Sequence, residues 1–242
     1  KDPYIRRRIM LLEVIATTVR DALLAEQSGA DRIELITGIL EGGLTPSYGL
    51  IDEVVHSTNI PVQVMIRPHS QSFCYDQRDL GVMIKDIQTV KRIGAHGIVL
   101  GALTAGRSID HETLRRLLDE AEGLSVTFHR AFDEVSNLEK ALEELLSYSQ
   151  IDRVLTSGGK PNVLDAQEEI RQLVKKAEHS HLQILAGSGL TVSSIPSFLQ
   201  STGVKEIHFG RGVRVDNDPL NEIDTDKIKD IKNIGRDHVA NG

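Results

Sequence analysis

Short apolar runs alternate with amphipathic stretches along almost the whole chain, and this alternation is the strongest constraint on its fold. Each apolar run is four to six residues long and most are rich in Val, Ile and Leu, which is typical of strands buried on both faces of a parallel sheet. We predict strands at Met10–Ile15, Arg32–Ile36, Val62–Arg67, Gly97–Leu100, Ser125–His129, Arg153–Thr156, Gln183–Ala186 and Glu206–Phe209.

The stretches between these runs have the period of helices. Asp110 is a candidate N-cap ahead of Leu114 and Leu117, and Ser136 and Glu139 have the spacing of a capping box. We predict helices at Thr18–Gln27, Ser47–Ser57, Asp79–Ile93, Asp110–Ala121, Ser136–Leu146, Val163–Ala177 and Thr191–Gln200.

Eight strands that alternate with seven or eight helices indicate a TIM-like (β/α)8 barrel, with an open doubly wound sheet as the alternative. The 242 residues suit one barrel domain, because such barrels often use 200–250 residues. Glycines such as Gly29 and Gly94 end helices just before a strand, as helix C-terminal residues do. We therefore expect one domain over 1–242, with a polar tail from about 211, a last helix at Thr225–Ile234 and a frayed end at Gly235–Gly242.

Composition narrows the class of protein. The formal charge of −7 gives no bulk attraction to nucleic acid or to anionic membranes. No window approaches 18 apolar residues, and no apolar leader follows the basic start Lys1–Met10, so we expect neither a membrane span nor a signal peptide. The single cysteine, Cys74, excludes an internal disulfide and suits a reducing compartment. We expect a cytoplasmic protein without nucleic-acid or membrane partners.

Polar side chains recur near the ends of the predicted strands, where active sites of such barrels lie. Because strand side chains alternate between faces, parity assigns an inward set of Glu13, Glu34, Arg67, His129, Ser157 and His208. Glu and His are common general acids and bases, so we predict catalytic roles for Glu13, Glu34, Arg67 and His129, with the arginine holding an anion. The alternative is a structural ion pair between Glu34 and Arg67, since a buried charge needs a partner.

Glycine-rich loops follow the last three predicted strands. Backbone N–H groups of such loops bind anions in these barrels, and the alternative is that the glycines only form tight turns. The predicted anion-binding residues are Ser157, Gly158, Gly187, Ser188, Gly189 and Gly210. The long loop Pro68–Tyr75 is a candidate lid over the mouth. Within it, Cys74 is expected to pack as a small apolar side chain rather than to act as a nucleophile.

Several segments resemble one family, the CutC-type copper homeostasis proteins. The resemblance runs from about Leu11 to His208, and its longest motifs read EGGLTPS from Glu41 and VTFHRAFD from Val126. Shorter matches are GADRIEL from Gly29, MIRP from Met65, FCY from Phe73 and VLTSG from Val154.

The resemblance implies a cytoplasmic TIM-like barrel that forms a homodimer or a larger homo-oligomer and handles copper. The family's proposed copper ligands include cysteines at the ends of the first two strands, where this chain has Ile15 and Ile36. Cu(I) prefers thiolate and thioether sulfur, so the remaining candidates for a copper site are Cys74, His129 and His208.

Two functions follow from these observations. The first is copper homeostasis, through binding or handling of the ion at the mouth of the barrel. The second is an enzyme that acts on a small phosphorylated or carboxylated metabolite by Glu and His acid–base chemistry. A third possibility is an oligomeric scaffold with a vestigial mouth. We take the first as the prediction and the second as its alternative, with a metal ion or a small molecule as the ligand.

Overall fold

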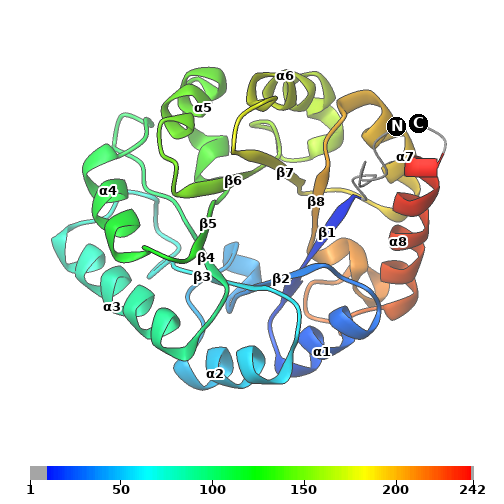
Figure 1. The fold of residues 1–242 in the computed structure, drawn as a ribbon, viewed down its shortest axis with the longest axis horizontal. Coiled ribbons are helices and arrows are strands. Elements are labelled where there is room, and N and C mark those ends of the chain that lie inside the picture. The colour runs from blue at the N-terminus through cyan, green and yellow to red at the C-terminus, as the bar shows by residue number, and fades with distance from the viewer. Residues whose placement is uncertain (1–9, 241–242) are drawn as a thin grey trace, which may run out of the picture.

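Eight parallel strands close into a barrel, which confirms the predicted (β/α)8 architecture (Figure 1). The structure is a computed structural model that describes residues 10–240. Each strand pairs with its neighbours in chain order, and β8 returns to β1. The strands are β1 Leu11–Ala16, β2 Arg32–Leu35, β3 Val62–Met65, β4 Gly97–Leu100, β5 Ser125–Phe128, β6 Ile151–Thr156, β7 Gln183–Gly187 and β8 Glu206–Phe209.

Helices form a ring outside the strands (Figure 1). The α-helices are α1 Val19–Gln27, α2 Tyr48–Ser57, α3 Gln77–Ile93, α4 His111–Glu120, α5 Leu138–Leu146, α6 Gln167–Ala177, α7 Ile195–Thr202 and α8 Thr225–Ala240. Short 3-10 helices lie in the connections: η1 Ile39–Glu41, η2 Arg130–Glu134, η3 Val163–Ala166, η4 Val192–Ser194, η5 Arg211–Val213 and η6 Val215–Asn217. No helix among residues 10–240 is long and apolar enough to cross a bilayer.

Local hydrogen bonding corrects three predicted helix boundaries. The N-cap of α5 is Asn137 rather than Ser136, because the Asn137 side chain accepts the N–H of Lys140. The N-cap of α3 is Asp76, which forms a capping box with Asp79 and so starts the helix at Gln77. The pattern predicted as one helix over 163–177 divides into η3 and α6.

The region after β8 is not a polar tail, because it packs back onto the barrel. Arg214 is almost fully buried and its guanidinium lies 2.9 Å from the Asp21 carboxylate of α1. Ile223, Ile228 and Ile231 join the apolar core. Helix α8 continues to Ala240 instead of fraying from Gly235. The basic start and the last two residues lie outside the described part of the chain.

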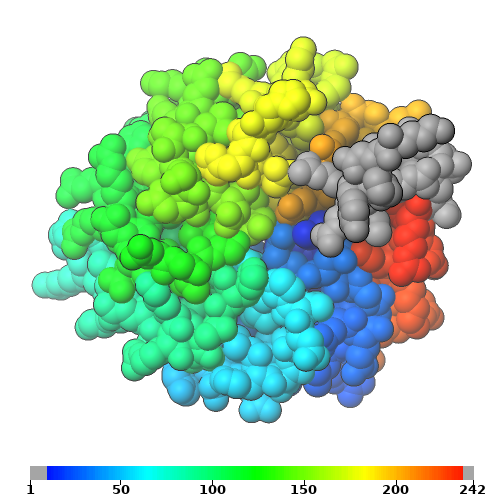
Figure 2. Space-filling view, in the orientation of Figure 1, coloured from blue at the N-terminus to red at the C-terminus, as the bar shows by residue number. Residues whose placement is uncertain are grey.

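The interior has an outer apolar shell and a mixed centre. Residues such as Leu12, Val14 and Ile33 point from the strands toward the helices and are fully buried. A small apolar cluster of Ile36, Met65 and Val99 lies inside the barrel instead. In the space-filling view, side chains close over the ring that the ribbon leaves open (Figure 2). The barrel is therefore a packed core whose functional groups lie at its rim.

Candidate functional site

A cavity of about 490 Å³ opens at the carboxyl ends of the strands. Glu34, Arg67, His129 and His208 line it, so four of the predicted inward residues meet in one place. They come from β2, the loop after β3, the residue after β5, and β8. Glu13 lies next to His208 but is fully buried and is not part of the lining. A volume of this size is in the range of small-molecule sites.

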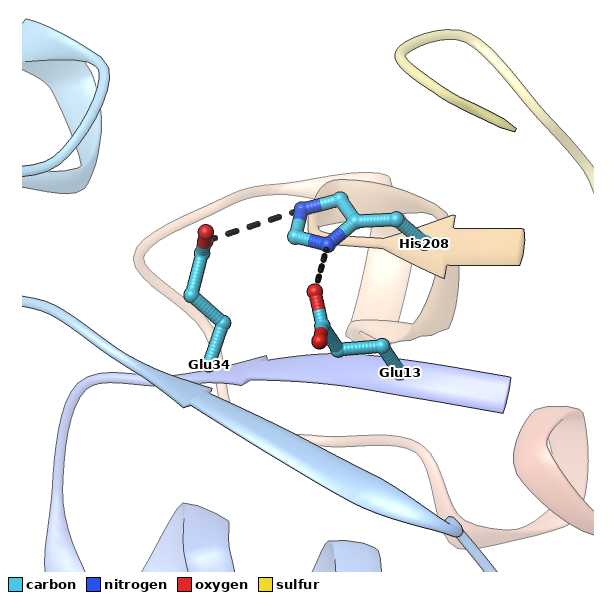
Figure 3. A group of neighbouring side chains, drawn as sticks. All are labelled: Glu13, Glu34 and His208. Atoms are coloured by element: carbon cyan, nitrogen blue, oxygen red, sulfur yellow. Dashed lines mark hydrogen bonds and ion pairs between the residues drawn. The ribbon is translucent and has the colours of Figure 1, made fainter. Parts of the chain in front are cut away.

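His208 connects two buried glutamates (Figure 3). Its Nδ1 is 2.8 Å from Oε1 of Glu13, and its Nε2 is 3.7 Å from Oε2 of Glu34. The Glu13 carboxylate also pairs with Arg32, whose guanidinium lies 2.7 Å from Glu206. The result is a continuous buried chain of alternating charges that leads from the cavity into the barrel.

The two glutamates have opposite electrostatic environments. Burial favours the neutral form of both, but the Arg32 charge and the hydrogen bond to His208 outweigh it at Glu13 and lower its pKa to about 2. Glu34 has no guanidinium partner, so burial dominates, aided by the nearby Glu13 charge, and raises its pKa to about 7 in spite of His208. Oε1 of Glu34 has no hydrogen-bond partner among the described residues. Glu34 is therefore a group in this site that can take up and release a proton near neutral pH.

The pKa of His208 is raised although burial opposes its charge, because Glu34 and Glu13 both stabilise the imidazolium. His129 differs, since burial and the Arg67 charge lower its pKa to about 3. The His129 ring is therefore neutral at pH 7. Its Nδ1 accepts the N–H of Ala131 at 3.2 Å, which places the ring proton on Nε2. That Nε2 has no hydrogen-bond partner among residues 10–240 and is available to donate to a ligand oxygen.

Arg67 is held in place by backbone carbonyls and an aromatic ring. Its Nη1 donates to Glu41 O at 3.0 Å and Gly43 O at 3.2 Å. The guanidinium carbon lies 4.6 Å from the centre of the Phe73 ring, which also contacts His129. The alternative of a structural ion pair between Arg67 and Glu34 does not hold, because Arg67 makes no ion pair with any described residue.

Two glycines make room for the histidines. A Cβ at Gly101 would lie 2.6 Å from Nδ1 of His129, and one at Gly187 would lie 3.1 Å from the Cβ of His208. The sequence shows Gly101 and Gly187 directly at the ends of β4 and β7. Gly187, predicted to bind an anion, therefore serves to accommodate His208 and does not line the cavity.

Inward polar residues nearer the amino ends of the strands are missing from the predicted set. Arg32 and Glu206 belong to the buried charge chain, and Arg153 of β6 lies within 3.4 Å of Glu206. Gln63 is fully buried and neither atom of its amide has a partner. Strand parity identifies all of these residues as inward, because each lies an even number of positions from one that was chosen. Arg32 and Glu206 lie two positions away, and Gln63 and Arg153 lie four positions away. They differ from the cavity-lining residues only in that they lie deeper in the barrel.

The predicted anion-binding residues divide into two groups. Ser188, Gly189 and Gly210 line the cavity. Ser157 and Gly158 do not, because they are engaged within the protein: Ser157 N and Oγ donate to Asp133, and Gly158 N donates to Thr156 Oγ1. The loop after β6 thus forms a turn fixed by Asp133, as the tight-turn alternative holds.

Cys74 is separated from the predicted metal-binding histidines. It is exposed, so the prediction that it packs as a small apolar side chain is wrong. It does not line the cavity that His129 and His208 line. Its neighbour Phe73 is the residue of the long loop that reaches the mouth. The structure therefore does not bring Cys74, His129 and His208 together.

A different trio has the compactness of a metal site. One ligand atom each from Glu13, Glu34 and His208 lie within 4.8 Å of one another. Hydrogen bonding and ion pairing account for this spacing, because His208 uses Nδ1 on Glu13 and Glu13 also pairs with Arg32. Among the described residues, Glu13 and His208 are already partnered, whereas Oε1 of Glu34 lacks a hydrogen bond. The proximity of the three side chains therefore does not by itself indicate a bound ion.

Known barrels of similar shape include thiamine phosphate pyrophosphorylase from Pyrococcus furiosus, with a TM-score of 0.64 over 96% of this chain and 98% of that one. Its sequence is only 16% identical, so this likeness shows the fold alone.

Closer relatives share the sequence as well. A family protein CutC from Pasteurella multocida is 38% identical over 96% of this chain and 95% of its own length. The human protein named copper homeostasis protein cutC homolog is 42% identical over 82% of this chain and 72% of its own. The crystal structure of CutC from Streptococcus agalactiae matches with a TM-score of 0.77 and 32% identity, over 83% of this chain and 98% of that one. The model of the CutC family matches residues 10–213, and this chain belongs to the CutC family.

Proposed function

We propose that this protein acts in copper homeostasis and that the mouth of its barrel is the functional site. The process is the one in the printed names of the human and mouse relatives. A cytoplasmic location and a homodimer or larger homo-oligomer belong to the same proposal, as the family resemblance implies. The mouth is supported because buried polar groups without protein partners gather there and nowhere else among the described cavities.

At the level of chemistry, we propose that the mouth carries out acid–base catalysis on a small phosphorylated or carboxylated metabolite. The observation that carries this proposal is Glu34, a buried carboxyl with a pKa near 7 and an unpartnered oxygen beside the cavity. Glu34 exchanges a proton with the substrate, while Nε2–H of neutral His129 donates to an oxygen on which negative charge develops. Arg67 attracts an anionic group of the substrate.

Proton transfer is measurable before the full reaction is known. The protein is incubated in D2O with a panel of small phosphorylated and carboxylated metabolites, and loss of substrate C–H signals is followed by proton NMR. We expect at least one compound to exchange with wild type at a rate that falls about 100-fold or more in Glu34→Gln, the scale of general-base catalysis. Glu112→Gln, an exposed carboxyl on α4, is the matched control. Exchange that persists in Glu34→Gln contradicts the role of Glu34.

Direct copper binding is the second candidate, and the family name is what favours it. Within the mouth, His129 and His208 offer imidazole nitrogen, which suits Cu(II), whereas Cu(I) prefers sulfur. The only cysteine, Cys74, is exposed outside the cavity. We expect a Cu(II) titration followed by calorimetry to show one site per chain that Cys74→Ser leaves intact and His208→Ala removes. Binding that depends on Cys74 and not on His208 contradicts a copper site in the mouth.

A further inference from the structure

Backbone N–H groups are left without partners among the described residues where strands β7 and β8 separate. Their ladder ends with the pair Gly187 and His208. Beyond it, the backbone N–H groups of Ser188, Gly189, Gly210 and Arg211 make no hydrogen bond to any described residue. All of these residues line the cavity that Glu34 and His129 also line. Each of these residues is at least partly exposed, so its N–H can bond water or a ligand, and this part of the cavity offers a set of donors that the described residues do not use.

Steric constraints keep side chains out of this gap. Ser188 and Gly189 both have positive φ, at 77° and 87°, and the Ser188 hydroxyl turns away to donate to Pro161 O. A Cβ at Gly189 would lie 2.2 Å from the Asn162 side chain, and one at Gly212 would lie 2.6 Å from Leu190 O. The sequence thus presents main chain rather than side chains to whatever binds here.

Charge is distributed unevenly around the mouth. The acidic rim residues, Glu41, Asp133 and Glu134, lie in the connections after β2 and β5. The loops after β7 and β8 contribute no acidic residue to the lining. They contribute Arg211, which is exposed and makes no hydrogen bond or ion pair through its side chain to any described residue. This side of the cavity therefore favours an anion.

We propose that the loops after β7 and β8 bind the phosphate group of a phosphomonoester substrate, through the backbone N–H groups of residues 188, 189, 210 and 211 and the Arg211 guanidinium. The proposal rests on the acid–base function above and specifies its substrate class. A phosphomonoester carries nearly two negative charges and three acceptor oxygens at pH 7, which matches several donors from two loops better than a planar carboxylate does. The rest of a small molecule then reaches Glu34 and His129 in the same cavity.

Matched ligands separate phosphate from other anions. The full-length protein, labelled with ¹⁵N, is titrated at constant ionic strength with inorganic phosphate, glycerol 3-phosphate, glycerate and glycerol. We expect the two phosphate compounds to shift the amide signals of Ser188, Gly189, Gly210 and Arg211, and glycerate and glycerol to leave them in place. Equal binding of glycerate at the same amides assigns the loops to carboxylates and overturns the proposal, as does an absence of shifts there.

Two charge reversals supply the mutational test. Arg211→Glu is expected to weaken glycerol 3-phosphate binding at least about tenfold, or about 1.4 kcal/mol. Arg115→Glu changes the charge equally at an exposed position on α4 outside the cavity and is expected to leave the affinity unchanged. Equal weakening in both variants overturns a local subsite. Exchange of an unphosphorylated acid that depends on Glu34, together with no phosphate binding at the loops, overturns the subsite and leaves the acid–base function standing.

Discussion

The buried carboxyls Glu13 and Glu34 lie on opposite sides of the His208 imidazole and yet have very different pKa values (Figure 3). Both carboxyls are buried, and the difference comes mainly from Arg32, which pairs with Glu13 and not with Glu34, together with the hydrogen bond between Glu13 and His208. One carboxyl therefore stays ionised and fixes the imidazole, while the other changes charge near neutral pH. The two environments give the two glutamates different roles, because Glu13 positions His208 and Glu34 is left to transfer a proton.

The raised pKa of Glu34 predicts that this residue makes the folded protein less stable as the pH rises. Its folded pKa of about 7 exceeds its ordinary value of 4.5, so the folded state binds more protons between these values and stability falls as pH rises through them. The gap corresponds to at most about 3 kcal/mol. We expect the free energy of unfolding of Glu34→Gln, measured with urea, to rise by about 1–3 kcal/mol relative to that of wild type as the pH increases from 5 to 8. A difference that does not change with pH contradicts the raised pKa.

Strand parity found the rim residues because it depends only on alternation within one strand. It did not find the pairing of Glu13 with Arg32, or the absence of a pair between Glu34 and Arg67. Partners across strands depend on the stagger of the barrel, which sets Glu13 opposite Arg32 on one side and His208 on the other. That register is a property of the closed sheet and has no signal in a single strand.

At the scale of elements, one carboxylate attaches the loop after β6 to η2. Asp133 accepts hydrogen bonds from Thr156 Oγ1, from the backbone N–H of Ser157 and Gly159, and from the Ser157 hydroxyl. It also pairs with Arg130 at 2.8 Å. The polar residues that suggested an anion site after β6 thus hold two connections of the rim together.

Removing this carboxylate is expected to loosen the loop without unfolding the barrel. Asp133→Ala leaves several partly buried donors unpaired, at about 1–3 kcal/mol. We expect amide hydrogen exchange at Ser157 and Gly159 to become at least tenfold faster, with exchange in β1 and β2 unchanged. Asp119→Ala, at an exposed position of α4 where the side chain has no hydrogen-bond partner among the described residues, is the control. Unchanged protection at both amides would show that Asp133 does not fix the loop.

At the scale of the molecule, the alternation of apolar runs and helical patterns predicted a parallel sheet whose strands are covered on both faces. The number of strands, eight within one domain, then favoured the closed barrel over an open sheet. The region after β8 was not predictable in this way. Its composition is polar, and its attachment to the barrel depends on Arg214, whose partner Asp21 lies 193 residues earlier in the chain. From sequence alone, a polar segment is predicted to be exposed to solvent, because the distant residue that pairs with its buried charge cannot be recognised.

The buried pair Arg214 and Asp21 predicts that the region after β8 stabilises the whole molecule. Arg214→Ala leaves Asp21 buried without its partner, an effect of about 3–5 kcal/mol. For a chain of this size, we expect the Tm to fall by about 6–20 °C. Arg20→Ala, one residue before Asp21, removes an arginine whose side chain is 75% exposed in its pair with Glu222 and is expected to change stability by at most about 1 kcal/mol. Equal shifts in calorimetry for the two variants would mean that the segment from 214 onward is only a solvated tail.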